Sequence, residues 1–341
     1  MSDVATREDR VAALPWQRAL VRSLLARRAQ LPHAMLVTGP LGTGKQILAQ
    51  TLARALLCET PSAEGFACGQ CASCTYVAAG QHPDLRVVEP FEIDDDEIKP
   101  VEWIGVDKIR ALIRWSEITS HRGGAKVALI APAERMNEAA ANALLKTLEE
   151  PPDATYFLLV SHLTGRLAAT IVSRCQRIAA PRPTCDDARS WLAEHGVDAP
   201  DDALAQAHGA PLRALALADP QYQAERSAWI RAFATPVKLE IAAMGARIDA
   251  APREQRKDVL AAVVDWLLGW CSDLARVHAG AGPVAHAGFE KPLRELAASV
   301  APAGLFRYHR ELLTQRALLA HPLSPRLVAE ALMIEYRALF R

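Results

Sequence analysis

Three glycines and a lysine near the start of the chain have the types and spacing of a phosphate-binding loop. Gly39, Gly42, Gly44 and Lys45 lie between a short apolar run over residues 34–37, which predicts a strand, and an apolar helical pattern. In a Gly-x4-Gly-Lys loop, backbone N–H groups surround phosphate oxygens at a helix N-terminus and the lysine reaches the outer phosphates. We therefore expect a nucleotide site for ATP or ADP; the alternative is an ordinary glycine-rich turn.

The residues that would hydrolyse the nucleotide differ from those of a working ATPase. Gln46 stands where a Ser or Thr hydroxyl normally reaches Mg²⁺. The strand predicted over residues 126–130 is followed by Ala131 and Pro132, where an Asp for the Mg²⁺ shell and a Glu that activates water are expected. If the strand continued, the carboxylate of Glu134 would be displaced by roughly 6–7 Å. We expect no intrinsic ATPase activity, unless the strand ends elsewhere.

Four of the seven cysteines are clustered in a pattern that suits a metal. Cys58, Cys68, Cys71 and Cys74 have C-x9-C-x2-C-x2-C spacing, which brings four thiolates within reach of one tetrahedral ion. Such a set leaves no open coordination position, so we expect structural zinc in an inserted module over about residues 58–80. The alternative is four unrelated reduced thiols.

Composition and charge limit the class of protein. The chain has 341 residues, half of them hydrophobic, with 39 basic and 39 acidic side chains, so no overall field draws it to nucleic acid. Its first ten residues are polar and charged, and no apolar run approaches the ~20 residues of a membrane span. We expect a soluble, cytoplasmic protein with two or three domains.

Buried strands and helices alternate over the first half of the chain. Residues 85–88, 126–130, 155–160 and 176–178 read as strands of a parallel sheet, and residues 137–150 form an intervening helix that ends at two prolines. This alternation predicts an α/β domain around the P-loop.

After Pro181 and Pro183 the pattern becomes helical. The clearest helix is predicted over residues 252–278, with an apolar stripe at i, i+3, i+4 spacing. The last helix is expected to begin at Ser324 and Pro325 and to bury four apolar residues, which are Leu327, Val328, Leu332 and Ile334.

Three further motifs carry a resemblance to a known family. Gly-Gly-Ala-Lys-Val at 123–127, Asn-Ala-Leu-Leu-Lys-Thr-Leu-Glu-Glu-Pro-Pro at 142–152 and Ser-Arg-Cys at 173–175, together with the four-cysteine module, resemble the bacterial clamp-loader ATPases. The resemblance implies an α/β P-loop (AAA+) domain with a zinc-module insertion, followed by a small helical lid domain and an all-α collar domain. The expected boundaries are 1–180, 181–222 and 223–341.

The same resemblance implies partners and roles for two arginines. It implies a DNA polymerase III clamp loader with gamma/tau and delta subunits, which loads a sliding clamp on primed DNA. Arg174 would be an arginine finger that reaches a neighbour's γ-phosphate, or else a surface arginine paired with an acid. Arg213, in Gly209-x3-Arg213, falls on the family's sensor-2 position; a phosphate contact and a structural role both stay open.

The departures at Gln46, Ala131 and Pro132 make the chain most similar to a clamp-loader subunit that does not hydrolyse ATP. Two other classes are weighed against this one. One is a working gamma/tau-type AAA+ motor in which Gln46 and Glu134 replace the lost ligands. The other is a zinc-bearing DNA-binding protein with a degenerate P-loop, which the balanced charge disfavours.

Overall fold

The computed structural model describes residues 13–94, 97–319 and 324–340. The described residues form two compact units. The first extends to Trp191 and includes Ala210–Arg213, and the second contains Leu192–Gly209 and the chain from Ala214 onward. The polar first ten residues, on which part of the cytoplasmic prediction rests, lie outside the described residues.

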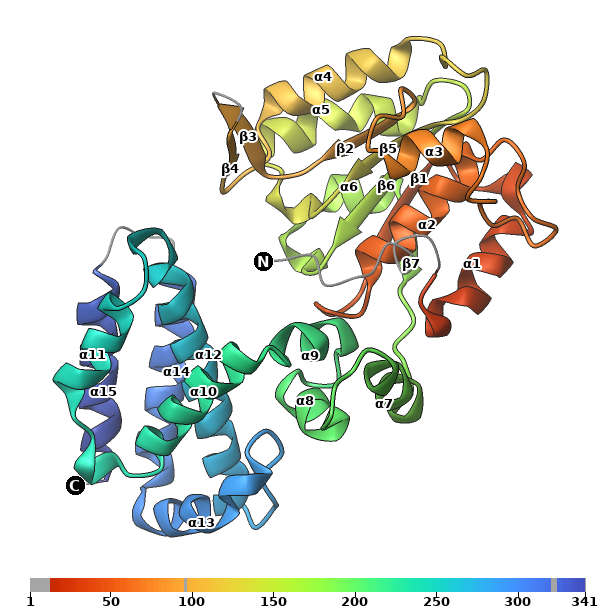
Figure 1. Ribbon diagram of the computed structural model, residues 1–341. Helices are drawn as coiled ribbons and strands as arrows, with labels where there is room; N and C mark the ends of the chain where they lie inside the picture. The colour runs from red at the N-terminus through yellow and green to blue at the C-terminus, as the bar shows by residue number, and fades with distance from the viewer. Residues whose placement is uncertain (1–12, 95–96, 320–323, 341) are drawn as a thin grey trace. The chain divides into compact units, whose positions relative to one another are not determined.

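A five-stranded parallel sheet forms the centre of the first unit (Figure 1). Its order is β2-β5-β6-β1-β7, so the strand that leads into the P-loop lies inside the sheet, between β6 and β7. The carboxyl ends of β1, β5 and β6 are therefore neighbours at one edge, where the candidate site forms. The strands are β1 (Ala34–Thr38), β2 (Leu85–Val88), β5 (Lys126–Ile130), β6 (Thr155–Ser161) and β7 (Gln176–Ala179).

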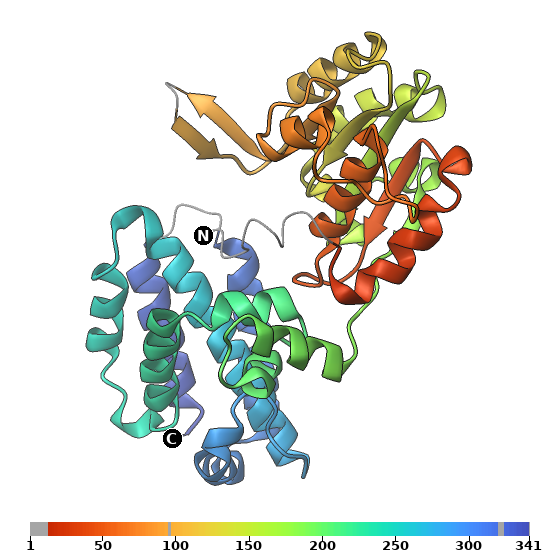
Figure 2. The same ribbon diagram turned by 45° about the vertical axis from the view of Figure 1, so that its right-hand side comes forward.

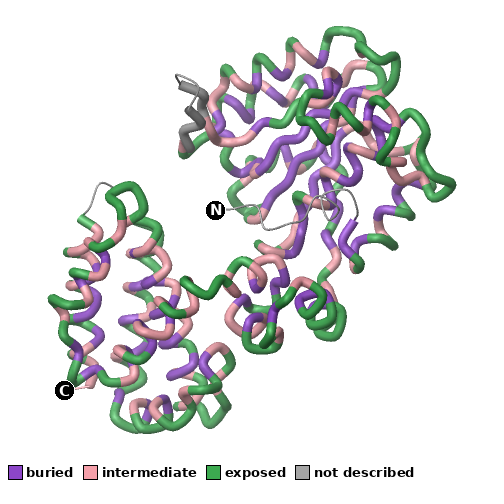
Figure 3. The backbone as a smooth tube through the Cα atoms, in the orientation of Figure 1, coloured by how far each residue is buried: buried purple, intermediate pink, exposed green. Residues whose placement is uncertain are grey.

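Helices cover both faces of this sheet, which explains why its inner strands are apolar on both sides. All five residues of β5 are buried, and Figure 3 shows the buried positions of this unit gathered along the strands. Asn137 caps the N-terminus of α5 by accepting a hydrogen bond from the Ala140 N–H at 2.8 Å. One face carries α1 (Arg18–Leu25), α2 (Lys45–Leu57) and α3 (Ala72–Ala78); the other carries α4 (Val106–Glu117), α5 (Glu138–Glu149) and α6 (Ala169–Arg174).

A two-stranded antiparallel hairpin, β3 (Phe91–Asp94) and β4 (Glu97–Pro100), is inserted between β2 and α4. Figure 2 shows it projecting from the sheet of the first unit. The hairpin forms a separate sheet, and β2 is the last strand of the five-stranded sheet.

The described chain after β7 is helical, as predicted. It contains α7 (Cys185–Glu194), α8 (Pro200–Gln206), α9 (Pro211–Leu217), α10 (Pro220–Phe233), α11 (Ile241–Asp249), α12 (Arg256–His278), α13 (Glu290–Ser299), α14 (Pro302–Leu318) and α15 (Pro325–Ala338). The predicted α/β domain around the P-loop and the helical C-terminal part are confirmed, and the three predicted domain boundaries stay a prediction. Within the described residues no helix is long and apolar enough to cross a membrane.

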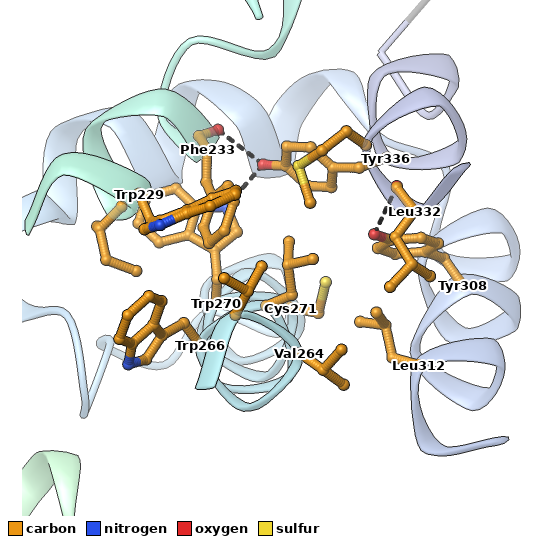
Figure 4. Packing of buried hydrophobic residues seen from close by; sticks show 14 of the residues in the cluster. Trp229, Phe233, Val264, Trp266, Trp270, Cys271, Tyr308, Leu312, Leu332 and Tyr336 are labelled. Atoms are coloured by element: carbon orange, nitrogen blue, oxygen red, sulfur yellow. Dashed lines mark hydrogen bonds between the residues drawn. The ribbon is translucent and has the colours of Figure 1, made fainter. Parts of the chain in front are cut away.

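Aromatic residues on α10, α12, α14 and α15 form the core of the helical bundle (Figure 4). The Trp270 indole N–H donates to the Tyr336 hydroxyl at 2.7 Å, and that hydroxyl donates to the Phe233 carbonyl at 2.8 Å. The Tyr308 hydroxyl donates to the Leu332 carbonyl at 2.9 Å. Each of these buried polar groups therefore has a partner, which removes the cost of burying it.

The prediction for the last helix is wrong at two positions. Leu327 and Ile334 are 64% and 52% exposed. The buried face of α15 instead contains Ala329, Leu332, Met333 and Tyr336, whose spacing follows one helical stripe. Leu327 and Ile334 are seven residues apart and share the outer face, so apolarity alone misassigned them.

Candidate functional site

The turn between β1 and α2 has a backbone that requires glycine. Gly39, Gly42 and Gly44 have φ values of 151°, 77° and 87°. A Cβ on Gly44 would lie 2.2 Å from the Leu14 Cδ1 atom, and a Cβ on Gly42 would lie 2.9 Å from the Arg213 Cβ atom. No side chain of a described residue caps α2, so the N–H groups of its first turn are available to an anion. These residues fit a phosphate cradle.

Two residues that precede the sheet donate hydrogen bonds to the backbone carbonyls of this turn. The Gln17 side chain donates to the Thr43 and Gly44 carbonyls at 3.2 and 2.9 Å, and the Trp16 indole N–H donates to the Thr43 carbonyl at 3.3 Å. Gln17 is fully buried. Hydrogen bonds to these backbone carbonyls hold the loop in place, and its backbone N–H groups stay available to a ligand.

Lys45 is the buried cation of the site. It is 2% exposed, and its ammonium donates to the Pro40 carbonyl of the same loop. Burial lowers the pKa of Lys45 to about 8, while the Glu134 carboxylate acts in the opposite direction. The side chain is therefore mostly protonated at neutral pH. When a phosphate binds, the ammonium would donate to it in place of the Pro40 carbonyl.

The chain does not continue as a strand after β5, so the displacement of Glu134 estimated on that condition does not apply. A single 3-10 turn over Ala133–Arg135 follows β5, and it brings Glu134 close enough to influence the pKa values of Lys45 and His162. Glu134 is 9% exposed; its Oε1 atom accepts from the His162 N–H at 2.9 Å. Its Oε2 atom is buried and has no partner among the described residues.

Two polar neighbours lie at the end of β6, the fully buried Ser161 and the half-buried His162. The Ser161 hydroxyl and the His162 Nδ1 atom have no hydrogen-bond partner among the described residues. Burial lowers the pKa of His162, and the Lys45 charge lowers it further, while the Glu134 charge acts in the opposite direction. Sequence reasoning missed both residues, although their position after a buried strand beside the P-loop strand was a usable signal.

The position next to the P-loop lysine carries no hydroxyl. The Gln46 amide donates to the Glu89 Oε1 atom at 3.1 Å, just beyond the end of β2. Ala131 and Pro132 offer no side-chain ligand after β5. The two usual protein ligands of nucleotide-bound Mg²⁺ and the acid that activates water are therefore all replaced.

The backbone around Arg213 lies against the P-loop. The Leu212 N–H donates to the Gly42 carbonyl at 3.2 Å, which fixes the start of α9 on the loop. The Arg213 backbone N lies 3.2 Å from where a Gly42 Cβ would be. Both alternatives for its guanidinium, a phosphate contact and a structural role, stay open.

Arg174 is at the C-terminal end of α6, separate from the P-loop residues in sequence. Its Nε atom donates to the Glu149 Oε1 atom at 2.6 Å, its Nη2 atom bonds the same oxygen, and Nη1 donates to the Thr170 carbonyl at 3.0 Å. The side chains of Arg174 and Glu149 keep 30% and 48% of their surface exposed. The guanidinium is thus paired with an acid but remains accessible.

The four cysteines come together as predicted. Their sulfur atoms all lie within 4.8 Å of one another, with 3.9 Å between Cys58 and Cys71 and 4.0 Å between Cys68 and Cys74. A tetrahedral zinc with Zn–S bonds of about 2.3 Å would separate its sulfurs by roughly 3.8 Å. The donor set fits zinc.

Backbone N–H groups also point at these sulfurs. The Cys71 N–H donates to the Cys68 sulfur at 3.3 Å, and the Cys74 N–H donates to the Cys71 sulfur at 3.4 Å. The Thr60 hydroxyl and backbone N–H groups lower the pKa of the Cys68 thiol to about 6. Such bonds favour thiolates, which are the form that binds a metal.

A buried polar chain that sequence reasoning did not find connects the cysteine module to the sheet. Ser73 donates to Glu59 at 3.1 Å and meets the His82 Nε2 atom at 3.1 Å. The fully buried Asp84 accepts from Ser120 at 2.9 Å and from the backbone N–H of Arg122 at 3.0 Å. The module is therefore tied to the start of β2 by hydrogen bonds.

Comparisons with known proteins agree on one family. A family model described as "DNA polymerase III, delta subunit" matches residues 17–183. The chain is 37% identical over 336 residues to a DNA polymerase III subunit delta′ of Pseudomonas aeruginosa, covering 95% of this chain and 97% of that protein. It is 33% identical to the subunit delta′ of Escherichia coli K12, covering 85% and 84%.

Among solved structures, a DNA polymerase III gamma subunit-related protein from Thermotoga maritima is similar with a TM-score of 0.47. It is 17% identical and covers 94% of this chain and 99% of that one.

Proposed function

Because the chain belongs to the family of DNA polymerase III delta′ subunits, we propose that it is a non-hydrolysing, stator-like subunit of the clamp loader. In this role it helps a multisubunit complex to load the sliding clamp on primed DNA. It also supplies Arg174 as an arginine finger to the ATPase site of a neighbouring subunit.

The observation that carries this proposal is an asymmetry between two places in the first unit. At the P-loop, the three positions for Mg²⁺ ligands and a general base hold Gln46, Ala131 and Pro132. At the end of α6, the Arg174 guanidinium is retained and accessible. A guanidinium at an interface stabilises charge on a transferring phosphoryl group in another subunit, and it needs no metal of its own.

The P-loop residues are proposed to hold ATP or ADP without hydrolysing it. Gly39, Gly42 and Gly44 would supply backbone N–H groups, Lys45 would contact the outer phosphates, and Arg213 would lie beside them. The cradle geometry and the buried ammonium support this role.

Cys58, Cys68, Cys71 and Cys74 are proposed to hold structural zinc. A closed set of four thiolates gives the metal a stabilising role, because no position is left for a substrate.

The proposed partners are the gamma/tau and delta subunits, with the clamp and primed DNA reached through the complex. The proposed location is the cytoplasm.

One observation favours a second candidate, in which this chain hydrolyses ATP itself. The Glu134 carboxylate is buried beside Lys45 and keeps one oxygen without a partner among the described residues. A carboxylate so placed has the chemistry of a general base. The absence of a hydroxyl at Gln46 and of acids at Ala131 and Pro132 weighs against this candidate.

Phosphate release by the purified full-length chain, with ATP and Mg²⁺, separates the two candidates. We expect no release above that of a Lys45→Ala variant, and a stable complex when the chain is mixed with gamma/tau and delta subunits. Rapid release that is lost in both Lys45→Ala and Glu134→Gln would overturn the non-hydrolysing role. Failure to form the complex would overturn the assignment to a clamp loader.

A further inference from the structure

A hollow of about 580 Å³ lies between the outer edge of β2 and one face of α4. Its apolar wall includes Val87, Phe91, Leu112 and Trp115. Lys108, Leu112 and Trp115 are spaced at i, i+4, i+7, so the helix presents one continuous face to the hollow. This site is distinct from the P-loop, the cysteine cluster and Arg174.

The strand that borders the hollow has an open hydrogen-bonding edge. Among the described strands, β2 is the last of the sheet and pairs with β5 alone. The Asp84 and Val88 carbonyls accept from the Val127 and Ala131 N–H groups at 2.9 and 3.0 Å. In a parallel ladder alternate residues bond to opposite sides, so the Val87 N–H and carbonyl point away from β5. No strand in the described part of the chain pairs with them, so they can pair with another strand.

The charge at the hollow is positive. Two of the residues that line the hollow, Arg86 and Lys108, are cations, and one lining residue, Glu89, is acidic. The Lys108 ammonium lies 5.0 Å from the Phe91 ring centre and donates to the Glu89 carbonyl at 3.2 Å. The Glu89 carboxylate accepts from Gln46. Neither cation forms an ion pair within the described part of the chain, so an acidic ligand meets uncompensated charge.

We propose that this hollow binds an extended segment of a partner protein, which adds to β2 as a sixth strand. The segment places one apolar side chain between Phe91, Leu112 and Trp115. Acidic side chains two residues before and after it meet Arg86 and Lys108. The combination of an open strand edge and a helix beside it is the geometry in which peptides bind by β-augmentation.

The two-residue spacing of the ligand follows from the strand itself. Side chains of a strand alternate between its faces, so the residues that face α4 are two apart. Val88, on the α4 face of β2, is buried against the α4 residues, and Arg86 shares that face. A ligand with an apolar residue and acids at both i−2 and i+2 therefore places its apolar side chain in the hollow and its acids near Arg86 and Lys108.

Binding of defined synthetic peptides to the full-length chain tests the proposal. The probe is a fluorescein-labelled decapeptide with a Glu-Thr-Phe-Thr-Glu centre, measured by fluorescence anisotropy. Two matched probes replace both Glu by Lys, or Phe by Ala. We expect saturable binding of the first probe, at least tenfold tighter than binding of either matched probe, and weakened by salt.

Substitutions at the strand edge distinguish β-augmentation from other modes of binding. Val87→Pro removes the outward N–H without removing a bond to β5, and we expect at least a tenfold loss of affinity. Val87→Thr keeps that N–H and should bind within about twofold of the original chain. Arg86→Glu should lower the affinity for the Glu-containing probe at least tenfold. Thermal melts of all variants check folding, and hydrogen exchange at the Val87 amide should slow when the probe is added to the unmodified chain.

Four results would overturn the proposal. They are the absence of saturable binding, equal binding of the Lys-containing probe, unchanged binding to a folded Val87→Pro variant, or no slowing of exchange at the Val87 amide. Self-association that Val87→Pro abolishes would show a second copy of this chain to be the occupant, which also contradicts a partner segment.

Discussion

Arg174 and Glu149 form a two-bond ion pair between the ends of α6 and α5, with the Arg174 Nε atom 2.6 Å from Glu149 Oε1. Both side chains remain partly exposed, and ion pairs of this kind are worth about 0–1 kcal/mol. Glu149 therefore orders the guanidinium without holding it tightly. A phosphate in a neighbouring subunit could capture it at little cost.

Replacing Arg174 by Ala should slow ATP hydrolysis in the reconstituted clamp loader. An arginine finger is worth about 10³-fold or more in rate at the site it serves. We expect that loss at the site facing this chain, measured as DNA-stimulated phosphate release. Glu149→Gln is the control: because the ion pair is weak, it should change the rate by less than about fivefold. Unchanged turnover with Arg174→Ala would exclude the role in trans.

Nucleotide binding should weaken as pH rises through about 8. Lys45 has a pKa of about 8 because burial favours its neutral form, and a bound phosphate favours the ammonium and raises that pKa. Binding above pH 8 thus takes up a proton, and affinity should fall up to about tenfold per pH unit. Titration of fluorescent ADP between pH 7.5 and 9.5 measures this. Lys45→Arg, charged throughout, should give a flat profile; an identical slope in that variant would assign the effect to another group.

The cysteine cluster should hold zinc, and losing one ligand should release it. Loss of a residue that supports a ligand costs 10–100-fold in affinity, so Cys71→Ser should weaken zinc binding by at least about 100-fold. Zinc content after dialysis and the thermal melt report the loss. The control is Cys185→Ser, since Cys185 is exposed and outside the cluster. Equal zinc content in both variants would mean that the cluster does not bind the metal.

Motifs with a fixed local geometry were predictable from the sequence. The glycine spacing predicted the turn before α2, and C-x2-C steps placed sulfurs together because three of the four cysteines lie within one short segment. The family resemblance drawn from residues 123–127, 142–152 and 173–175 is confirmed by the relatives.

Features that depend on how the chain turns after an element were not predictable. The position of Glu134 could not be fixed from the sequence because a 3-10 turn, which has no strong sequence signal, follows β5. Leu327 and Ile334 were misplaced because α15 has apolar residues on two faces, and tertiary packing selects one. The polar chain from Glu59 through Ser73, His82 and Asp84 to Ser120 joins segments that are separate in sequence.

In the helical bundle, Tyr336→Phe should destabilise the second unit more than Tyr308→Phe. The Tyr336 hydroxyl serves two buried partners, the Trp270 indole N–H and the Phe233 carbonyl, whereas the Tyr308 hydroxyl serves the Leu332 carbonyl (Figure 4). Each buried group left unpaired costs about 1–3 kcal/mol. We expect Tyr336→Phe to lower the free energy of unfolding by about 2–4 kcal/mol and Tyr308→Phe by about half as much, measured by urea denaturation. Equal losses in the two variants would mean that water or rearrangement satisfies the Trp270 N–H, and that this hydrogen-bond chain does not stabilise the bundle.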